Sequence, residues 1–222
     1  MSKLKNHPLR LSDFKWDNLS GLPTSTDIAV IGMSVRTAFA NNVDEFWKNL
    51  TNGKDCIHEI PDSIPVAVAG NLSSIVPSRI SYFLDLKGPA VLVDTACSSS
   101  LVAVHLACQG IRNGDCQQAI AGGVRINLVP IAHKTTIGIE SSDGKTKTFS
   151  DDSDGTGVGE GSAAVLLKPL DNAIKDNDNI YAVIKGSAVN QDGQSLGITA
   201  PSVEAQTRVI IKVQKTPPYD PF

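Results

Sequence analysis

The sequence has no long hydrophobic run and no strong excess of charge of either sign. No stretch of its 222 residues approaches the ~20 apolar residues that span a bilayer, and the opening MSKLKNHPLRLSDF lacks the apolar core of a signal peptide. The net charge of −3 does not indicate binding to nucleic acid or to an anionic membrane surface. We therefore expect a cytoplasmic protein that has neither a nucleic-acid partner nor a membrane partner.

Cysteine is scarce, and none of the four cysteines forms a CxxC pair. A disulfide framework and a bound metal are both weak interpretations of such spacing, and we expect no metal site. Cys108 falls on an apolar helical repeat, which favours packing over chemistry. Cys56 and Cys116 lie among polar residues, and we expect neither of them to have a role.

The composition is that of an ordinary globular chain, with 41% hydrophobic and 19% charged residues. Short apolar runs alternate with helical repeats from residue 27 onward, with strands predicted at 27–33, 163–167 and 181–189 and an amphipathic helix at 43–50. This alternation predicts layered α/β structure. Residues 1–26 show no sustained periodicity and are predicted to be a linker or an N-terminal arm. The folded part is expected over residues 27–213, followed by a tail at 214–222.

The stretch Pro89 to Ile111, PAVLVDTACSSSLVAVHLACQGI, organises the chain. An apolar run, Ala90 to Val93, predicts a buried strand, and a helical repeat begins within a few residues of Asp94. Cys97 falls on the turn between them, where the positive end of a helix favours thiolate over thiol. It is a candidate nucleophile, although a free cysteine is more commonly a small buried apolar residue.

Three polar or glycine-rich features have simpler structural interpretations. Gly155 to Gly161 has the glycines of a phosphate-binding loop, but no Walker lysine follows and the segment precedes a strand, so a nucleotide site is disfavoured. Gly122 and Gly123, within a predicted strand at 118–126, indicate close approach by another backbone. Asp94, at a strand end, is expected to cap the following helix or to bond local backbone, rather than to act as an acid or base.

A resemblance to a known family rests on five stretches. DTACSSSLVAVHLACQGIRNGDCQQAIAGGV resembles the active-site segment of β-ketoacyl synthases, most closely the ketosynthase domains of modular polyketide synthases. The other four occur in the same order as in that family: DIAVIGMS, SRISYFLDLKGPA, DGKTKTFSDDSDGTGVGEGSAAVLLKPL and IYAVIKGSAVNQDGQSLGITAP. Together they cover most of the chain.

The resemblance implies a thiolase-like α/β fold, of which this chain would hold the N-terminal half as an incomplete α-β-α layered unit. A long family segment normally separates the EIP motif from SRISYF, whereas here the two are nearly joined, so we expect internal shortening near residues 61–70. Family members continue into a second half after the helix expected at 207–213, so truncation or a shifted reading frame is expected, with residues 214–222 as a tail outside the family pattern.

The resemblance also assigns roles to residues. Cys97 would accept an acyl chain carried on the phosphopantetheine of an acyl carrier protein, with no cofactor bound to the chain itself. Glu160, between Gly159 and Gly161, would be a structural hydrogen-bonding residue beside the cysteine. Thr199, Ala200 and Pro201 would lie near the entrance for the phosphopantetheine arm, the alternative being a plain turn. A homodimer is implied through the strand next to the nucleophile.

Histidine limits the expected chemistry. In this family, two histidines in an HGTGT-like loop and a GH-containing loop assist decarboxylative condensation with a malonyl-type extender. His7, His58, His105 and His133 match neither loop, and His105 is expected to be a packed helix residue. We therefore expect acyl transfer without complete condensation.

Two other functions stay open. The chain is alternatively a non-catalytic remnant or an interaction module for carrier proteins or intact ketosynthases. An enzyme acting on coenzyme A thioesters, of the thiolase or chalcone synthase type, is disfavoured by the VNQDG and GEG motifs.

Overall fold

The computed structural model describes residues 26–56, 72–126 and 138–215. The elements, in order, are β1 (Ile28–Thr37), α1 (Val43–Thr51), α2 (Ile75–Phe83), a 3₁₀ turn (Ala96–Ser98), α3 (Ser99–Arg112), β2 (Ala119–Arg125), β3 (Gly161–Pro169), α4 (Leu170–Lys175), β4 (Ala182–Ile184) and α5 (Val203–Lys215). The predicted alternation of strands and helices is confirmed. The strand expected at 181–189 is shorter than predicted, and the last helix begins four residues earlier.

The four strands form one sheet in the order β2-β3-β1-β4, with every neighbouring pair antiparallel. β1 pairs with β3 along its whole length, apart from a bulge between Val30 and Gly32. At that bulge the backbone N–H of Tyr181 donates to the carbonyl of Val30, at 2.9 Å. The central position of β1 explains why its first residues are apolar and buried, since both of its edges and both of its faces are covered there.

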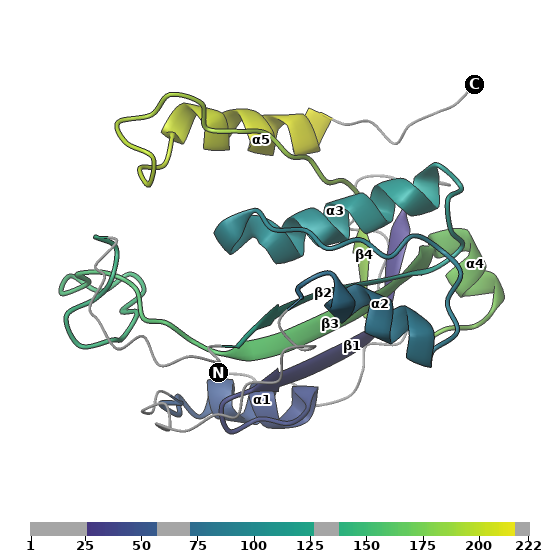
Figure 1. Ribbon diagram of the computed structural model, residues 1–222, viewed down its shortest axis with the longest axis horizontal. Coiled ribbons are helices and arrows are strands. Elements are labelled where there is room, and N and C mark those ends of the chain that lie inside the picture. The colour runs from purple at the N-terminus through teal and green to yellow at the C-terminus, as the bar shows by residue number, and fades with distance from the viewer. Residues whose placement is uncertain (1–25, 57–71, 127–137, 216–222) are drawn as a thin grey trace, which may run out of the picture.

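Helices cover both faces of the sheet (Figure 1). Ile28 and Val30 point to the face under α3, where they pack with Cys108 and Ile111, whereas Ala29 points to the opposite face. There it packs with residues of and after α4, namely Leu170, Ala173 and Ile180. Figure 1 also shows α1 across the sheet from α3. The predicted α-β-α layering is therefore present.

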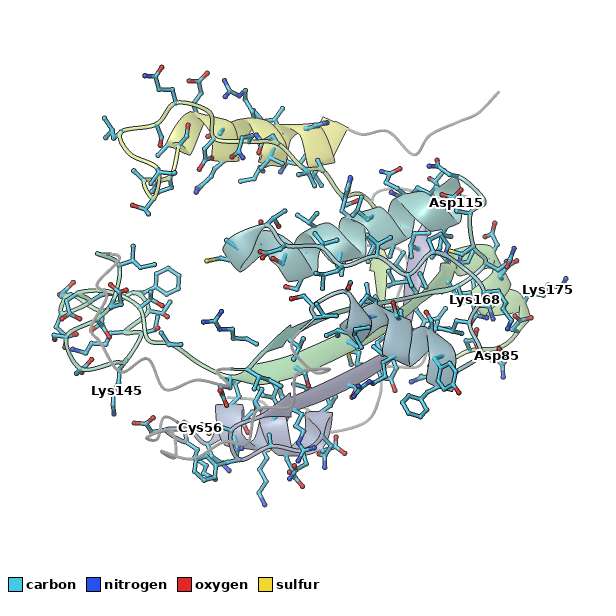
Figure 2. The ribbon with its side chains drawn as sticks, viewed as in Figure 1. Cys56, Asp85, Asp115, Lys145, Lys168 and Lys175 are labelled. Atoms are coloured by element: carbon cyan, nitrogen blue, oxygen red, sulfur yellow. The ribbon has the colours of Figure 1, made fainter. Side chains whose placement is uncertain are left out.

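Charged groups close the end of the sheet where these two clusters lie. Lys168 lies at the end of β3 (Figure 2). It donates to Asp176 and, at 2.7 Å, to Asp178, both after α4. Lys185 pairs with Asp27, whose side chain is 1% exposed. Because a buried carboxylate needs a partner, these pairs fix how the ends of β1, β3 and β4 meet.

The predicted strand Ala90–Val93 is wrong. This segment belongs to no strand, and the side chains of Val91 and Leu92 are 64% and 45% exposed. An apolar run becomes a strand only where a neighbouring strand offers hydrogen bonds, and β2 and β4 end the described sheet without a strand beyond them. The run therefore carries its apolar side chains to the surface of the described chain.

Several predictions fall outside the described residues. These are the arm at 1–26 except for Thr26, the shortened segment near 61–70, and residues 216–222 of the tail. Over the ranges that the structure does describe, no helix has both the length and the apolar character needed to cross a bilayer.

Candidate active site at Cys97

Cys97 lies in the 3₁₀ turn immediately before α3 and is exposed. The predicted position, on a turn at the start of a helix, is confirmed. Cys108, eleven residues later and within α3, is 0% exposed and packs in the core between α3 and the sheet. The two cysteines of this segment therefore divide as predicted, with one open to solvent and one packed.

Hydrogen bonds from short side chains define the turn that carries Cys97. Asp94 accepts from the backbone N–H of Ala96 at 3.1 Å, so its predicted bond to local backbone is confirmed. Ser99 Oγ accepts from the N–H of Thr95 at 2.9 Å and donates to the carbonyl of Ala96 at 2.7 Å. Ser98 Oγ donates to the carbonyl of Thr95 at 2.9 Å. The serines that follow the cysteine thus help to build the turn.

The turn is strained at the residue before the nucleophile. Ala96 has a φ of 56°, in the left-handed region that a residue with a Cβ rarely adopts. Such a conformation costs on the order of 1 kcal/mol and persists only when its surroundings hold it. The hydrogen bonds of Asp94 and Ser99 to Ala96 are the groups that hold it here. The sharp bend lets Cys97 precede the helix and stay exposed.

The start of α3 is seated directly on β2. A Cβ added to Gly123 would lie 2.9 Å from the Cβ of Ser100, and one added to Gly122 would lie 2.8 Å from the carbonyl oxygen of Ala163. Contacts this short are not found with real side chains, so both positions need glycine. The predicted close approach of another backbone is confirmed at Gly122, whereas the nearest neighbour of Gly123 is the side chain of Ser100. Gly123 therefore sets how closely α3 packs on the sheet.

The glycine-rich loop reaches the sheet beside this contact. Gly161 begins β3 and pairs with Arg125 of β2. The pair of Gly123 and Ala163 lies two residues away along the same two strands. That offset corresponds to about 7 Å along the strand. Gly159 lies in open space, and Glu160 is exposed. The roles predicted for Gly159, Glu160 and Gly161 beside the cysteine stay predictions.

The other glycines of this loop serve packing within the loop. A Cβ on Gly157 would lie 2.0 Å from the carbonyl oxygen of Gly144, and one on Gly155 would lie 2.5 Å from the backbone of Glu140. Gly157 also donates its N–H to Thr146 Oγ1 at 2.8 Å. This close packing of the loop against residues 140–146 explains why Gly155 and Gly157 are glycines, without a bound phosphate. Sequence spacing alone does not reveal it, because the partner segment is more than ten residues away.

Thr199, Ala200 and Pro201 lie in the loop between β4 and α5. The N–H of Ala200 donates to the carbonyl of Gly197 at 2.9 Å, which makes this segment a turn. Thr199 and Pro201 are exposed. A role for the three residues at the substrate entrance stays a prediction.

His105 is the only histidine among the residues that the structure describes. Its Nδ1 lies 2.8 Å from Ser187 Oγ, and its side chain is half-buried, in agreement with a packed helix residue. It is eight residues after Cys97, about 12 Å along a helix axis. His7, His58 and His133 lie outside the described residues. The described chain therefore places no imidazole within reach of the Cys97 sulfur.

The expectation for Cys116 needs correction. Its surroundings in sequence are polar, but its side chain packs against the core cluster under α3 and lies 3.7 Å from a Cβ placed on Gly110. The residue follows a turn that folds it back beneath the helix, a contact that local polarity does not show. Burial and, to a lesser degree, the neighbouring Asp115 raise the pKa of the Cys116 thiol. Cys56, after α1, lies across the sheet from α3 (Figure 2).

Family models match most of the chain. A model of the β-ketoacyl synthase N-terminal domain matches residues 25–68 and 62–173, two segments that meet where the sequence predicts internal shortening. A model of the β-ketoacyl synthase C-terminal domain matches residues 181–221. This second match runs through most of the 214–222 segment that the sequence pattern sets apart from the family.

Curated relatives are polyketide synthases. A highly reducing polyketide synthase of Aspergillus calidoustus is 48% identical over 151 residues, which are 67% of this chain and 6% of the relative. The polyketide synthase PksM of Bacillus subtilis is 52% identical over 137 residues, or 61% of this chain and 3% of the relative. The chain thus spans less than a tenth of these proteins.

Solved ketosynthases share the fold. The ketosynthase from module 6 of the bacillaene synthase of Bacillus subtilis matches with a TM-score of 0.79 and 32% identity, covering 86% of this chain and 48% of its own. The Streptomyces albus oxazolomycin ketosynthase domain matches with a TM-score of 0.77 and 26% identity, covering 84% of this chain and 49% of its own. The chain belongs to the β-ketoacyl synthase family and holds part of a thiolase-like ketosynthase domain of the modular polyketide synthase type.

Proposed function

We propose that Cys97 accepts an acyl group from the phosphopantetheine arm of an acyl carrier protein. The observation that carries this proposal is the exposed cysteine on a strained turn at the start of a helix, within the family's active-site motif. Four serine and aspartate hydrogen bonds hold that turn, which therefore presents the sulfur in one place.

The reaction would exchange one thioester for another. The Cys97 thiolate attacks the carbonyl carbon of the incoming thioester, and the new carbon–sulfur bond forms as the bond to pantetheine sulfur breaks. The pantetheine thiolate leaves and takes up a proton from solvent. Backbone N–H groups and the positive end of α3 favour the negative charge that starts on the sulfur and moves to the carbonyl oxygen.

The arrangement around Cys97 supports acyl transfer more strongly than decarboxylative condensation. Decarboxylative condensation develops an enolate that needs positioned cationic or hydrogen-bonding groups. In the described residues the histidine is His105, which bonds to Ser187 about two helical turns from the cysteine. We therefore propose the acyl-transfer step for this chain and expect condensation with a malonyl-type extender, the general role of the family, to be slow or lost.

Intact mass spectrometry tests the proposal. The full chain would be incubated with an acyl-loaded carrier protein or a small acyl thioester, alongside Cys97→Ala. We expect one acyl adduct on the wild-type chain and none on the variant. Burial raises the pKa of Cys108 and Cys116, so less of each thiol is thiolate at pH 8 than in an exposed cysteine.

Cys116→Ala is the matched control, because it removes a thiol outside the turn, and it should keep the adduct. An adduct that persists in Cys97→Ala would place the reactive thiol elsewhere. A chain that binds acyl carrier protein in a pull-down but gains no adduct would instead be a non-catalytic interaction module.

A further inference from the structure

Three consecutive residues after β4 each contact a different element. Lys185 pairs with Asp27 at the start of β1. A Cβ added to Gly186 would lie 3.3 Å from the carbonyl oxygen of Val213, so α5 packs closely against this backbone. Ser187 Oγ lies 2.8 Å from His105 Nδ1 of α3. The start of β1, α3 and α5 thus meet at residues 185–187, which we call the junction.

The junction is where the loop between β4 and α5 begins. This loop, residues 188–202, carries Thr199, Ala200 and Pro201, and Leu196 and Ile198 within it are fully exposed. Asn190 provides a second anchor, because its Nδ2 donates to the carbonyl of Ala205 at 2.7 Å, at the start of α5. This bond joins the loop to α5, the helix at which the loop ends. The bond from Ser187 to His105 ties it to the Cys97 helix.

Figure 1 shows how this bond joins distant parts of the chain. α5 runs along the side of α3 that faces away from the sheet, and the loop before α5 lies on the side of the view where α3 begins. Much of α5 is open to solvent, since Val203 and Ile210 are 79% and 56% exposed. The position of the loop relative to α3 therefore depends strongly on the junction.

The groups around His105 are cationic. Arg112 lies on the same helix and Lys212 on α5, while Lys185 beside Ser187 is paired with Asp27. Burial first, then Arg112 and Lys212, lower the pKa of His105. The ring is therefore neutral at pH 7.5, and protonation would add a third positive charge between α3 and α5.

We propose that His105 is a positioning residue. Through its bond to Ser187 it holds the 188–202 loop and α5 in place over α3, the helix that begins after Cys97. The loop's part in admitting an acyl-pantetheine arm rests on the proposed function. The contact between His105 and Ser187 does not depend on the proposed function. In its neutral form His105 keeps the loop seated, and in its charged form it repels Lys212 and frees the loop.

Hydrogen–deuterium exchange of the full chain at pH 7.5 tests the contact. His105→Ala and Ser187→Ala should each raise exchange of peptides from 188–202 by about three- to tenfold, the effect of one lost hydrogen bond. The double variant should exchange no faster than either single one, because both remove the same bond. Ser187→Thr, which keeps the hydroxyl, should stay near wild type.

The pH dependence separates positioning from a merely structural role. After correction for intrinsic exchange, protection of 188–202 should fall in the wild-type chain as the ring gains a proton, which the lowered pKa of His105 puts at a lower pH than for an exposed histidine. In His105→Asn, which keeps an amide near the ring nitrogen but does not titrate, protection should not change as the pH falls. The proposal is overturned by unchanged exchange in both alanine variants, by additive effects, or by loss of protection in β1 and β3 as well.

The outcome is distinguishable from that of the proposed function. Faster loop exchange in the variants, with no acyl adduct on wild-type Cys97, would overturn acyl transfer and leave the contact standing. An adduct that forms equally fast in wild type, His105→Ala and Ser187→Ala, with unchanged loop exchange, would overturn the positioning role alone.

Discussion

Gly123 is the residue on which the placement of the nucleophile depends most directly. Its missing side chain lets Ser100, three residues after Cys97, rest on β2. The sequence predicts a close approach at this glycine, because a strand interior gains nothing else from one. It does not predict the partner, which comes from a different element and is fixed only by tertiary packing.

Gly123→Ala should therefore lower stability and disturb the site together. Its Cβ would lie 2.9 Å from that of Ser100, so α3 has to shift away from the sheet, and such overpacking costs about 1–3 kcal/mol. Urea unfolding measures the loss, and the rate of Cys97 acylation should fall with it. Gly159→Ala is the matched control, since a Cβ there meets nothing within 4 Å. Equal stability of the two variants would contradict the packing described for Gly123.

At the scale of elements, local pattern predicts the helices and most strands but misjudges one apolar run. α1 begins as its sequence indicates, because Asn42 accepts from the N–H of Glu45 at 2.8 Å and Glu45 accepts from the N–H of Asn41 at 2.8 Å. Such caps are local and visible in sequence. The run Ala90–Val93 has the same apolar signal as β1, but a strand also needs a partner, and partners are set by the whole fold.

α3 is unevenly covered along its length, and this predicts an uneven response to mutation. Ile111 is 7% exposed and packs in the core, whereas Leu101, in the first turns after Cys97, is 74% exposed. Ile111→Ala should cost about 2–4 kcal/mol of unfolding free energy, and Leu101→Ala less than about 1 kcal/mol. Urea titration of both variants at matched m-values measures the difference. Similar losses would show that the first half of α3 is covered in solution.

For the whole molecule, the two core clusters of the described residues lie at one end of the sheet. The clusters on both faces of the sheet lie where β1 begins and β3 ends, joined by the pairs Lys168–Asp178 and Asp27–Lys185. The end that carries Cys97 has large exposed apolar side chains instead, Val91, Leu101 and Val124 among them. Family motifs in the sequence predict the fold and the nucleophile, because motifs keep local geometry. They do not predict which surfaces this chain leaves uncovered, because exposure depends on packing between elements that are distant in the sequence.

The predicted homodimer can be tested at this surface. Val91 lies in the segment beside the nucleophile turn and is 64% exposed, so a charged side chain there should leave the fold intact but oppose burial against a second copy. We expect the wild-type chain to sediment at twice its 23.5 kDa mass and Val91→Lys at the single mass, with the same melting temperature at low concentration. Leu196→Lys, in the exposed loop before α5, is the matched control and should leave the sedimentation of the wild type unchanged. Wild-type chain that sediments as a monomer, or a Val91→Lys variant that stays dimeric, would exclude pairing through this segment.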